Sequence, residues 1–496
     1  MKIIVYLFLV SIFWGDYLHD HLHLIPRVVM WLPEFLAMVV AVYLPIGFKH
    51  NRRRPPAKYV LLYGLFLSVL LLGWLLNMVG AAPMVVGLRT YCKYIPWFFL
   101  PFVLEYSEKE IKGQLKFILF MTLLQTPLAL YQRFIQFRGL LTGDYITGSL
   151  INSGLLAIYL FMVIAVLFGL YLRKQLNLFL FLFLSLIVFI PTTMTEVKAA
   201  IVFVPLAVMV PSVVAGHGSG WAKRFLLMPL LILMFGVVFV PIYDHFMRPR
   251  WGYGIMDFLN MEGRVEGYLY KNASGRRNEQ LGRIDCILLA YKELSKDPFT
   301  VLLGLGAGNV TTSAIEGLQG EQAKFGRLGV GTSTFTNCFW EIGLLGFGLH
   351  LMLMVFVFND ARRQAQGGGF LGGLAAGWCG VVVVMVIALF YKNYLPSTCL
   401  INLFWYLSGV VVASSGQPSA VGARRVLMKM KHGTTGVRPK HQREVASSGG
   451  MLVGSASSGK GTFRSSRVPL IPTVCVAAAP LAMASAFRLK GRCPCA

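Results

Sequence analysis

The sequence has 496 residues, of which 56% are hydrophobic and only 14% are charged, and its formal net charge is +25. Soluble domains are about one-quarter charged, so this composition excludes an ordinary soluble domain and predicts a membrane protein. The positive charge does not predict a nucleic-acid partner. About half of the excess lies in the segment 415–496, and most of the rest lies in short loops between apolar runs.

Twelve apolar runs follow one another along the chain, and most are long enough to cross about 30 Å of hydrocarbon. They lie near residues 3–15, 29–48, 59–80, 91–104, 116–131, 149–172, 176–191, 197–214, 225–242, 338–358, 371–390 and 397–414. The first, fourth and fifth are short, so ten or eleven spans is the competing count if some are re-entrant. We therefore predict an all-α polytopic membrane protein with about twelve transmembrane helices and one large extracytoplasmic loop.

Basic residues predict the orientation of these helices. The loops 49–58, 105–116, 173–174, 217–224 and 361–366 fall on one face and together hold 14 Lys or Arg residues. The short loops of the opposite face hold about half as many. Because basic loops remain on the cytoplasmic side of a membrane, both chain termini are predicted to be cytoplasmic.

The predicted helices divide the chain into four parts. Helices 1–9 occupy 1–242, a large outer loop occupies 243–337, helices 10–12 occupy 338–414, and a basic tail occupies 415–496. The tail is rich in Gly, Ser and basic residues and has no periodicity, so we expect it to be disordered. It is either a segment that binds anionic membrane lipid or an out-of-frame extension.

Some cations depart from the charge bias, because they lie on the outer side at or just inside the ends of predicted spans. They are Arg89, Lys93, Arg133, Arg138 and Lys198. Cations at membrane depth are costly and often functional. Each of them could instead extend to the lipid headgroups or pair with one of two supporting carboxylates in the same layer, Glu196 and Glu341. One lipid-linked diphosphate would explain all of the cations together.

The outer loop contains one segment with helical spacing, residues 281–295. Its apolar stripe consists of Ile284, Leu288, Tyr291 and Leu294. Arg283 lies off this stripe, so we expect an amphipathic helix that packs on the membrane domain or lies in the interface, with Arg283 facing a cavity.

Two other features of the outer side are weaker. The turn 304–309 is rich in Gly but lacks GxGxxG spacing, so we expect a tight turn near a substrate or a neighbouring helix. His19, His21 and His23 alternate in one loop, and either form a metal site or belong to an interfacial loop that binds nothing. The eight Cys residues have neither disulfide nor zinc spacing. No metal or other cofactor is expected.

Several short motifs resemble the bacterial O-antigen ligase and polymerase superfamily. The resemblance is clearest in Arg283-Ile-Asp-Cys-Ile-Leu-Leu-Ala-Tyr-Lys, Asp297-Pro-Phe, Gly304-Leu-Gly-Ala-Gly-Asn and Thr336-Asn-Cys-Phe-Trp-Glu-Ile-Gly-Leu-Leu-Gly. Upstream, Pro191-Thr-Thr-Met-Thr-Glu-Val-Lys-Ala-Ala is similar to a helix start of the family, with Lys198 where Arg is usual. The resemblance covers roughly residues 60–414 and depends on the order of the motifs and on the topology.

This resemblance implies a glycosyltransferase of the bacterial inner membrane that acts on an undecaprenyl-diphosphate-linked glycan. Chain-length regulator or flippase proteins are the partners that it suggests. It implies catalytic roles for Arg283 and Lys198. The residues expected to bind the diphosphate are Arg89, Lys93, Arg133, Arg138, Asn309 and Asn337. Cations on the outer face could neutralise the charge that develops on a diphosphate leaving group without a metal.

One departure from the family favours a polymerase over a ligase. Family ligases carry a His before the Asn at the end of the loop, but Thr336 stands there, and no His occurs between His245 and His350. An imidazole base is therefore unavailable in this loop. We predict a polymerase that joins repeat units into a surface polysaccharide. The alternatives are a ligase that transfers glycan to lipid A core, and a transporter of an anionic solute, which would need broken helices near its site.

Overall fold

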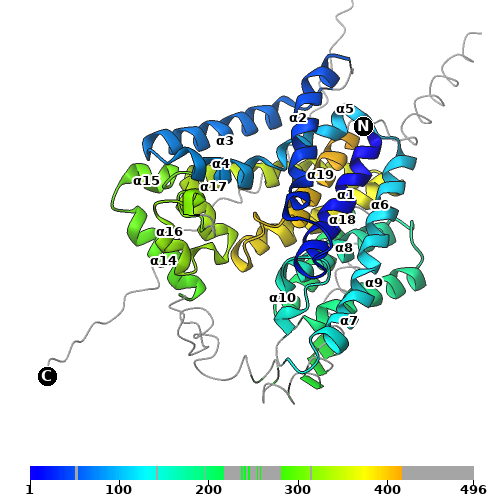
Figure 1. The fold of residues 1–496 in the computed structure, drawn as a ribbon. Coiled ribbons are helices and arrows are strands. Elements are labelled where there is room, and N and C mark those ends of the chain that lie inside the picture. Colours follow the sequence, from blue (N-terminus) through cyan, green and yellow to red (C-terminus); the bar gives the residue numbers. More distant parts are fainter. Residues whose placement is uncertain are drawn as a thin grey trace, which may run out of the picture. The chain divides into compact units, whose positions relative to one another are not determined.

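The computed structural model describes residues 1–50, 54–140, 143–195, 197–216, 281–312 and 316–415, with isolated positions between 236 and 257. Within these residues the chain forms helices joined by turns (Figure 1). The predicted span 225–242 lies almost wholly outside the described residues. Glu196 and the tail beyond residue 415 lie outside them as well.

Eight helices of the described residues are long and apolar enough to cross a membrane. They are Lys2–Asp20 (α1), Val28–His50 (containing α2, Leu32–His50), Ala57–Leu76 (α3), Glu108–Gln136 (α6, Glu108–Leu123, with α7, Gln125–Tyr131, and η2, Gln132–Gln136), Ser153–Leu172 (α8), Thr334–Ala365 (α17), Gly369–Tyr391 (α18) and Thr398–Ser415 (α19). Three shorter apolar helices are Ile95–Leu104 (α5), Leu178–Met194 (α9) and Ala200–Ala215 (α10). The chain is therefore an all-α membrane protein of several spans.

The predicted span 91–104 is not one continuous helix. Helix α4 (Ala81–Cys92) ends beside Lys93, and α5 begins at Ile95 with a proline in its first turn. Proline lacks a backbone N–H and is favoured at a helix start, so it begins a new helix more readily than it continues an old one. The break leaves Lys93 between two short helices.

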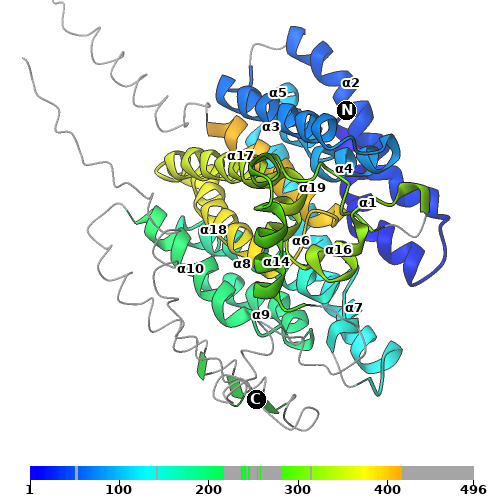
Figure 2. The ribbon, with the colours of Figure 1, turned by 90° about the vertical axis from the view of Figure 1, so that its left-hand side faces the viewer.

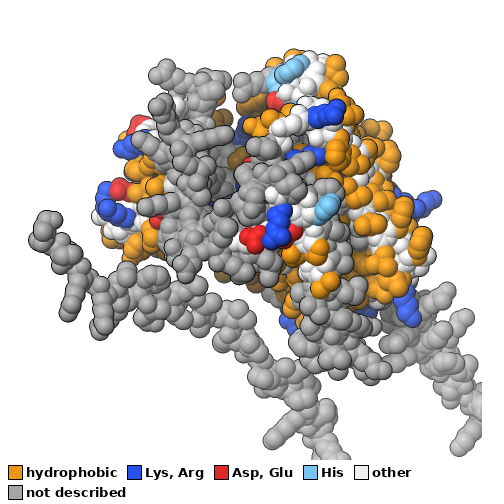
Figure 3. All heavy atoms as spheres, turned by 90° about the horizontal axis from the view of Figure 1, so that it is seen from below, with side chains coloured by type: hydrophobic (Ala, Val, Ile, Leu, Met, Phe, Trp, Pro, Cys, Tyr) orange, Lys and Arg blue, Asp and Glu red, His pale blue; other side chains and the backbone are white. Residues whose placement is uncertain are grey.

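Apolar side chains cover much of the described surface, as membrane-spanning helices require (Figure 3). Inside, α8 and α18 approach so closely that a Cβ atom on Gly169 would lie 2.3 Å from the backbone nitrogen of Gly377. Without a hydrophobic force between helices in lipid, close backbone approach through small residues supplies the packing contacts. Figure 2 shows these two helices side by side with α10.

The basic loops meet on one face, which we call the basic face. The Lys58 ammonium lies 2.6 Å from the Asp360 carboxylate, and the Arg173 guanidinium donates to the carbonyl of Ala365. The Lys112 ammonium lies 4.8 Å from the centre of the Phe370 ring. These contacts bring the loops 49–58, 105–116 and 173–174 to the loop 361–366 or to residues beside it, as the charge pattern predicts. The fifth basic loop, 217–224, lies outside the described residues.

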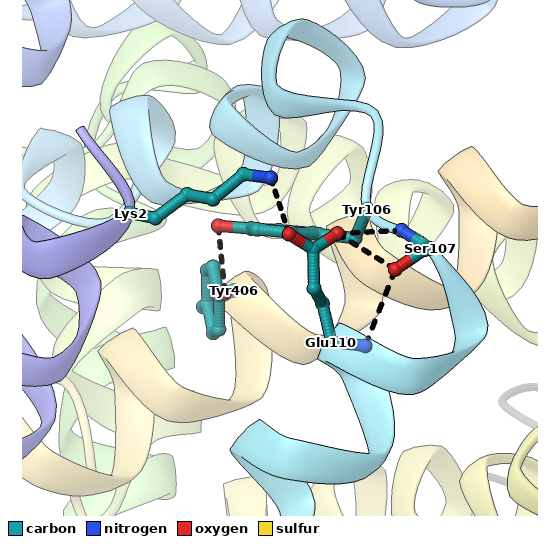
Figure 4. Close-up of polar contacts among 5 residues, drawn as sticks. All are labelled: Lys2, Tyr106, Ser107, Glu110 and Tyr406. Carbon is teal, nitrogen blue, oxygen red and sulfur yellow. Dashed lines mark hydrogen bonds and ion pairs between the residues drawn. The ribbon is translucent and has the colours of Figure 1, made fainter.

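A capping box begins α6 on this face (Figure 4). The Ser107 hydroxyl accepts a hydrogen bond from the N–H of Glu110, and the Glu110 carboxylate accepts one from the N–H of Ser107. This reciprocal pair satisfies backbone donors that a helix start leaves open. The same carboxylate pairs with Lys2, and the hydroxyl groups of Tyr406 and Tyr106 lie 3.1 Å apart. The starts of α1 and α6 are thereby held together.

The segment 281–332 contributes short helices, most of which pack on α17, while η4 contacts α4. They are α14 (Arg283–Leu294), α15 (Pro298–Leu303), η4 (Glu316–Leu318), α16 (Ala323–Arg327) and η5 (Val330–Thr332). Figures 1 and 2 both place α14 and α16 near α17. A small separate core joins these elements, formed by Ala290, Leu294, Val310, Phe339 and Trp340.

The predicted apolar stripe of α14 is only partly its buried face, because Leu294 is buried and Ile284 is half-buried. The buried residues are Cys286, Ala290 and Leu294, whereas Leu288 and Tyr291 are 55% and 62% exposed. Cys286 and Ala290 recur every fourth residue, so they share a face, and their small side chains allow α14 to approach α17 closely. The sequence analysis chose the buried face of α14 by hydrophobicity alone, and it therefore selected the larger apolar residues of the neighbouring face.

Candidate functional site

The glycine turn 304–309 fits into a break in α17. Gly343 has φ +62°, and the N–H of Leu305 donates to the carbonyl of Trp340 at 2.7 Å. A Cβ atom on Gly343 would lie 2.3 Å from the carbonyl oxygen of Leu302. A Cβ on Gly304 would lie 2.4 Å from the carbonyl carbon of Glu341. The glycines are therefore required by contact with a neighbouring helix, one of the two roles expected for this turn.

Glu341 fixes this turn from α17. Its carboxylate accepts hydrogen bonds from the hydroxyls of Tyr91 and Thr311, each at 2.9 Å, and from the backbone of Gly308 and Val310. The side chain is only 1% exposed. Hydrogen-bond donors stabilise this buried carboxylate, whereas one of the alternatives considered from the sequence was a cationic partner. These contacts anchor the turn, and a supporting role for Glu341 in a functional site stays a prediction.

Asn337 and Asn309 lie on either side of this carboxylate network. The Asn337 amide donates to the Tyr91 hydroxyl at 3.0 Å, which leaves that hydroxyl to donate to Glu341. The Asn309 amide donates to the carbonyl of Leu305 at 2.8 Å, and its buried carbonyl oxygen has no partner among the described residues. Both asparagines shape the turn, and their binding of a diphosphate stays a prediction.

Glu341→Gln is expected to lower stability more than turnover. An amide of the same shape keeps one acceptor oxygen and places an NH2 group against existing donors, at a cost of about 1–3 kcal/mol for an unsatisfied buried group. Thermal unfolding of the purified variant should show the loss, while activity per folded molecule stays near that of the parent. The exposed Glu321→Gln is the matched control. A variant as stable as its parent but inactive would show that Glu341 acts in the chemistry.

Arg89 and Lys93 form one cationic group, but carboxylates accompany it. The Arg89 guanidinium lies 2.7 Å from the Glu34 carboxylate and 4.2 Å from the centre of the Trp31 ring. The Lys93 ammonium donates to the carbonyl of Pro396 at 3.0 Å and interacts with Glu34 and Asp16. Two acidic groups thus offset the two cations. Pairing within the protein accounts for Arg89, although its partner is Glu34 and neither of the two carboxylates we had considered.

The remaining outer cations occupy different surroundings. Arg133 is buried in η2, beside Gln132, whose amide donates to the carbonyl of Gly148 at 2.9 Å. Arg138 is exposed in the turn that follows η2. Lys198 is half-buried just before α10. The part of each in binding a diphosphate stays a prediction.

A second cationic group, which we call the Arg283 cluster, consists of Arg283, Tyr391, Lys392 and Asp144. The Arg283 guanidinium lies 4.8 Å from the centre of the Tyr391 ring, a distance at which a cation is attracted to a ring face. Lys392 interacts with both Arg283 and Asp144. Among the described residues, the cluster brings together two cations and one carboxylate.

Burial lowers the pKa of the Lys392 ammonium, and the nearby Arg283 guanidinium lowers it further, while Asp144 raises it. Two like charges held together in a half-buried place disfavour each other. A bound anion would relieve that repulsion. Anion binding at the cluster stays a prediction.

Three helix starts surround the end of α18 that carries the cluster. In α8, a Cβ on Gly154 would lie 3.7 Å from the Tyr391 ring and 3.9 Å from the Lys392 side chain. In α10, the Phe203 ring packs edge-on against Tyr391 at 5.7 Å. In α17, the Thr334 hydroxyl donates to the carbonyl of Lys392 at 3.1 Å. Helix N-termini carry partial positive charge and exposed N–H groups, so their convergence favours an anion.

The sequence interpretation missed Lys392, although the signal that identified the other outer cations applied to it. Lys392 follows directly on the predicted span 371–390 and lies on the side where basic residues are scarce. It joins Arg283, from a segment more than a hundred residues earlier, only in the folded chain. Lys198 lies five residues before Phe203 in the sequence, and its place beside this group stays a prediction.

Thr336 and two of the three alternating histidines make other contacts in the structure. The Thr336 hydroxyl bonds to Ser333 within the cap of α17, at 2.9 Å from the Ser333 hydroxyl. His19 contacts the carbonyl of Ile25 at 2.9 Å, and His21 lies against the rings of Tyr17 and Phe137. Among the described residues, no three His, Cys, Asp or Glu side chains are grouped so that they could hold a metal ion.

No protein-family model, curated protein or solved structure matches this chain. The fold defines its class, which is an all-α membrane protein with several spans. Among the described residues of this chain, the Arg283 cluster is the group that is best suited to bind an anion. The resemblance to the O-antigen ligase and polymerase superfamily stays a prediction.

Proposed function

We propose that this chain is a membrane glycosyltransferase that polymerises undecaprenyl-diphosphate-linked repeat units into a surface polysaccharide. The observation that carries the proposal is the Arg283 cluster, where two cations and three helix starts meet at the ends of apolar helices. A lipid-linked diphosphate brings its charge to this depth while its prenyl chain stays in the bilayer. The site would act in a bacterial inner membrane, in a chain of twelve spans with both termini cytoplasmic.

The chemistry needs charge neutralisation more than a metal or other cofactor. The new glycosidic bond forms as a hydroxyl of the acceptor glycan attacks the anomeric carbon and the bond from that carbon to the diphosphate breaks. Undecaprenyl diphosphate departs with the electron pair, and the proton of the hydroxyl passes to the departing diphosphate or to water. Arg283, Lys392 and Lys198 would stabilise the charge developing on this leaving group. Each charge-assisted hydrogen bond contributes about 1.5–3 kcal/mol, and fixed donors at a developing charge favour the transition state.

A transporter of an anionic solute is the second candidate, because two apolar helices are interrupted. The α4–α5 break lies at Lys93, and α17 departs from helical geometry at Gly343. Transporters place substrates at such breaks. The break at Gly343, however, is occupied by the backbone of Leu302 and Gly304, which leaves less room for a solute there.

A deletion strain distinguishes these functions. Loss of a polymerase should leave surface glycans of a single repeat unit, and plasmid-borne parent protein should restore long chains. Accumulation of long polymer on its lipid carrier would instead identify a ligase. Unchanged glycans together with lost uptake of an anionic solute would identify a transporter and contradict the proposal.

The proposed role of Lys392 predicts a pH dependence. The lowered pKa of its ammonium means that the cation is lost at a lower pH than for an ordinary lysine. Substrate binding should therefore be complete below this pKa and should weaken as the pH rises through it. Lys392→Arg keeps its charge to above about pH 12, so its kcat/KM should stay high where that of the parent falls. Identical alkaline limbs in both proteins would exclude Lys392 from the site.

A further inference from the structure

A cavity of about 530 Å³ opens near the basic face, on the side opposite to the Arg283 cluster. Its walls come from α6, α8, α9, α18 and α19, and Figure 1 shows α6, α8 and α9 next to one another. The volume lies within the range of about 300–1,000 Å³ that is usual for pockets of small molecules. The proposed glycosyltransferase reaction makes no use of this cavity.

The cavity is apolar along its length and cationic at its mouth. Lys112 and Lys116 line it at the start of α6, and Gln175 lines it beside the α8–α9 turn. Thr122 lies ten residues beyond Lys112, or about 15 Å deeper at 1.5 Å per residue. There its hydroxyl is paired with that of Tyr159 and with the carbonyl of Ile118. The deep end thus offers no unsatisfied polar group to water.

The charges at the mouth favour an anion. Lys116 is exposed, and Lys112 pairs with Glu108 at 2.7 Å, with both side chains more than 40% exposed. An exposed pair of this kind contributes little stability, so it can exchange for another anion at small cost. Two lysines and one glutamate leave a positive excess at the mouth of the cavity, beside the headgroups of the basic-face leaflet.

From this arrangement we infer that the cavity binds one anionic phospholipid of the membrane. The phosphate of the headgroup lies between Lys112 and Lys116, and one acyl chain runs along the apolar walls toward Thr122 and Tyr159. Basic residues near a membrane surface attract anionic lipid by about 1 kcal/mol each. The charge of the headgroup and the apolar contacts of the acyl chain therefore both contribute to binding in this cavity.

The test compares phosphatidylglycerol with phosphatidylcholine of identical acyl chains, bound to the full-length protein purified in a neutral detergent. Native mass spectrometry should show a roughly tenfold preference for phosphatidylglycerol, equivalent to about 1.4 kcal/mol. The double variant Lys112→Gln/Lys116→Gln should bind both lipids within about twofold of each other, because about 1 kcal/mol per lysine is lost. Lys109→Gln, exposed on the same helix, should keep the preference of the parent.

A second pair of variants tests the acyl chain. Leu119→Trp fills the cavity from α6 and should reduce retention of both lipids, whereas Leu186→Trp, on the exposed face of α9, should not. Equal retention of the two lipids by the parent would overturn the headgroup site. Unchanged retention of both lipids in Leu119→Trp would show that the lipid does not bind in this cavity. Because the lysine variants alter only surface charge, they keep the test decisive if Leu119→Trp fails to fold.

Discussion

Arg283→Ala is expected to lower polymerisation by about one to two decades, at about 1.4 kcal/mol per decade of rate, while membrane abundance stays normal. The guanidinium lies on Tyr391 next to Lys392, where it would contact the diphosphate. Removing it takes away one charge-assisted contact that strengthens as the leaving group departs. Polysaccharide chain length in a complemented deletion strain measures the effect. Lys292→Ala, exposed on the same helix, is the matched control.

Two substitutions of Lys198 are expected to have opposite effects on activity. Lys198→Arg should be tolerated or improve activity, because a guanidinium retains the charge and can bind an oxyanion through two donors. Lys198→Glu should abolish activity, because it brings a negative charge toward the same anion. Full-length polymer in both Arg283→Ala and Lys198→Ala cells would contradict a shared anion site.

Gly343→Ala is expected to reduce the amount of folded protein severalfold. The residue has φ +62°, and its Cβ would lie 2.3 Å from a backbone oxygen and 2.5 Å from the backbone nitrogen of Gly304. A left-handed conformation alone costs a non-glycine residue about 1–3 kcal/mol, and the clash with backbone atoms adds to it because neither helix nor turn can move freely. Membrane abundance and the midpoint of thermal unfolding measure the loss.

Gly348→Ala provides the control for this prediction in the same helix. A Cβ at Gly348 meets no atom within 4 Å, so alanine should be neutral or slightly stabilising through its better helix propensity. If Gly343→Ala were as abundant and as stable as Gly348→Ala, the packing of the glycine turn into α17 would be wrong.

The helices were predictable because hydropathy is a local property of the chain. Each apolar run longer than about 18 residues can be recognised without knowledge of its neighbours, and α8, α17, α18 and α19 all fall where runs were found. The charge pattern likewise predicted that the loops with Lys58, Arg173 and Lys112 share a face. The failures of local reasoning were the interrupted segment around Lys93 and the buried face of α14.

Much of the candidate site was less predictable, because its partners are distant in sequence. Arg89 pairs with Glu34, 55 positions away, and Glu341 receives a hydrogen bond from Tyr91, 250 positions away. No spacing rule relates such residues. From the sequence alone, a carboxylate at membrane depth could be paired either with a cation or with several hydroxyl groups. Arg283 was identified from its place on a helix, but Lys392 became significant only through its proximity to Arg283.

Reconstitution tests the central claim most directly. The full-length protein is placed in liposomes with undecaprenyl-diphosphate-linked repeat units, and glycan length and released undecaprenyl diphosphate are measured. The account predicts products that lengthen by whole repeat units, with one undecaprenyl diphosphate released for each bond formed and with both signals strongly reduced in Arg283→Ala. Substrate that remains unchanged beside folded parent protein, with no diphosphate released, would contradict the account.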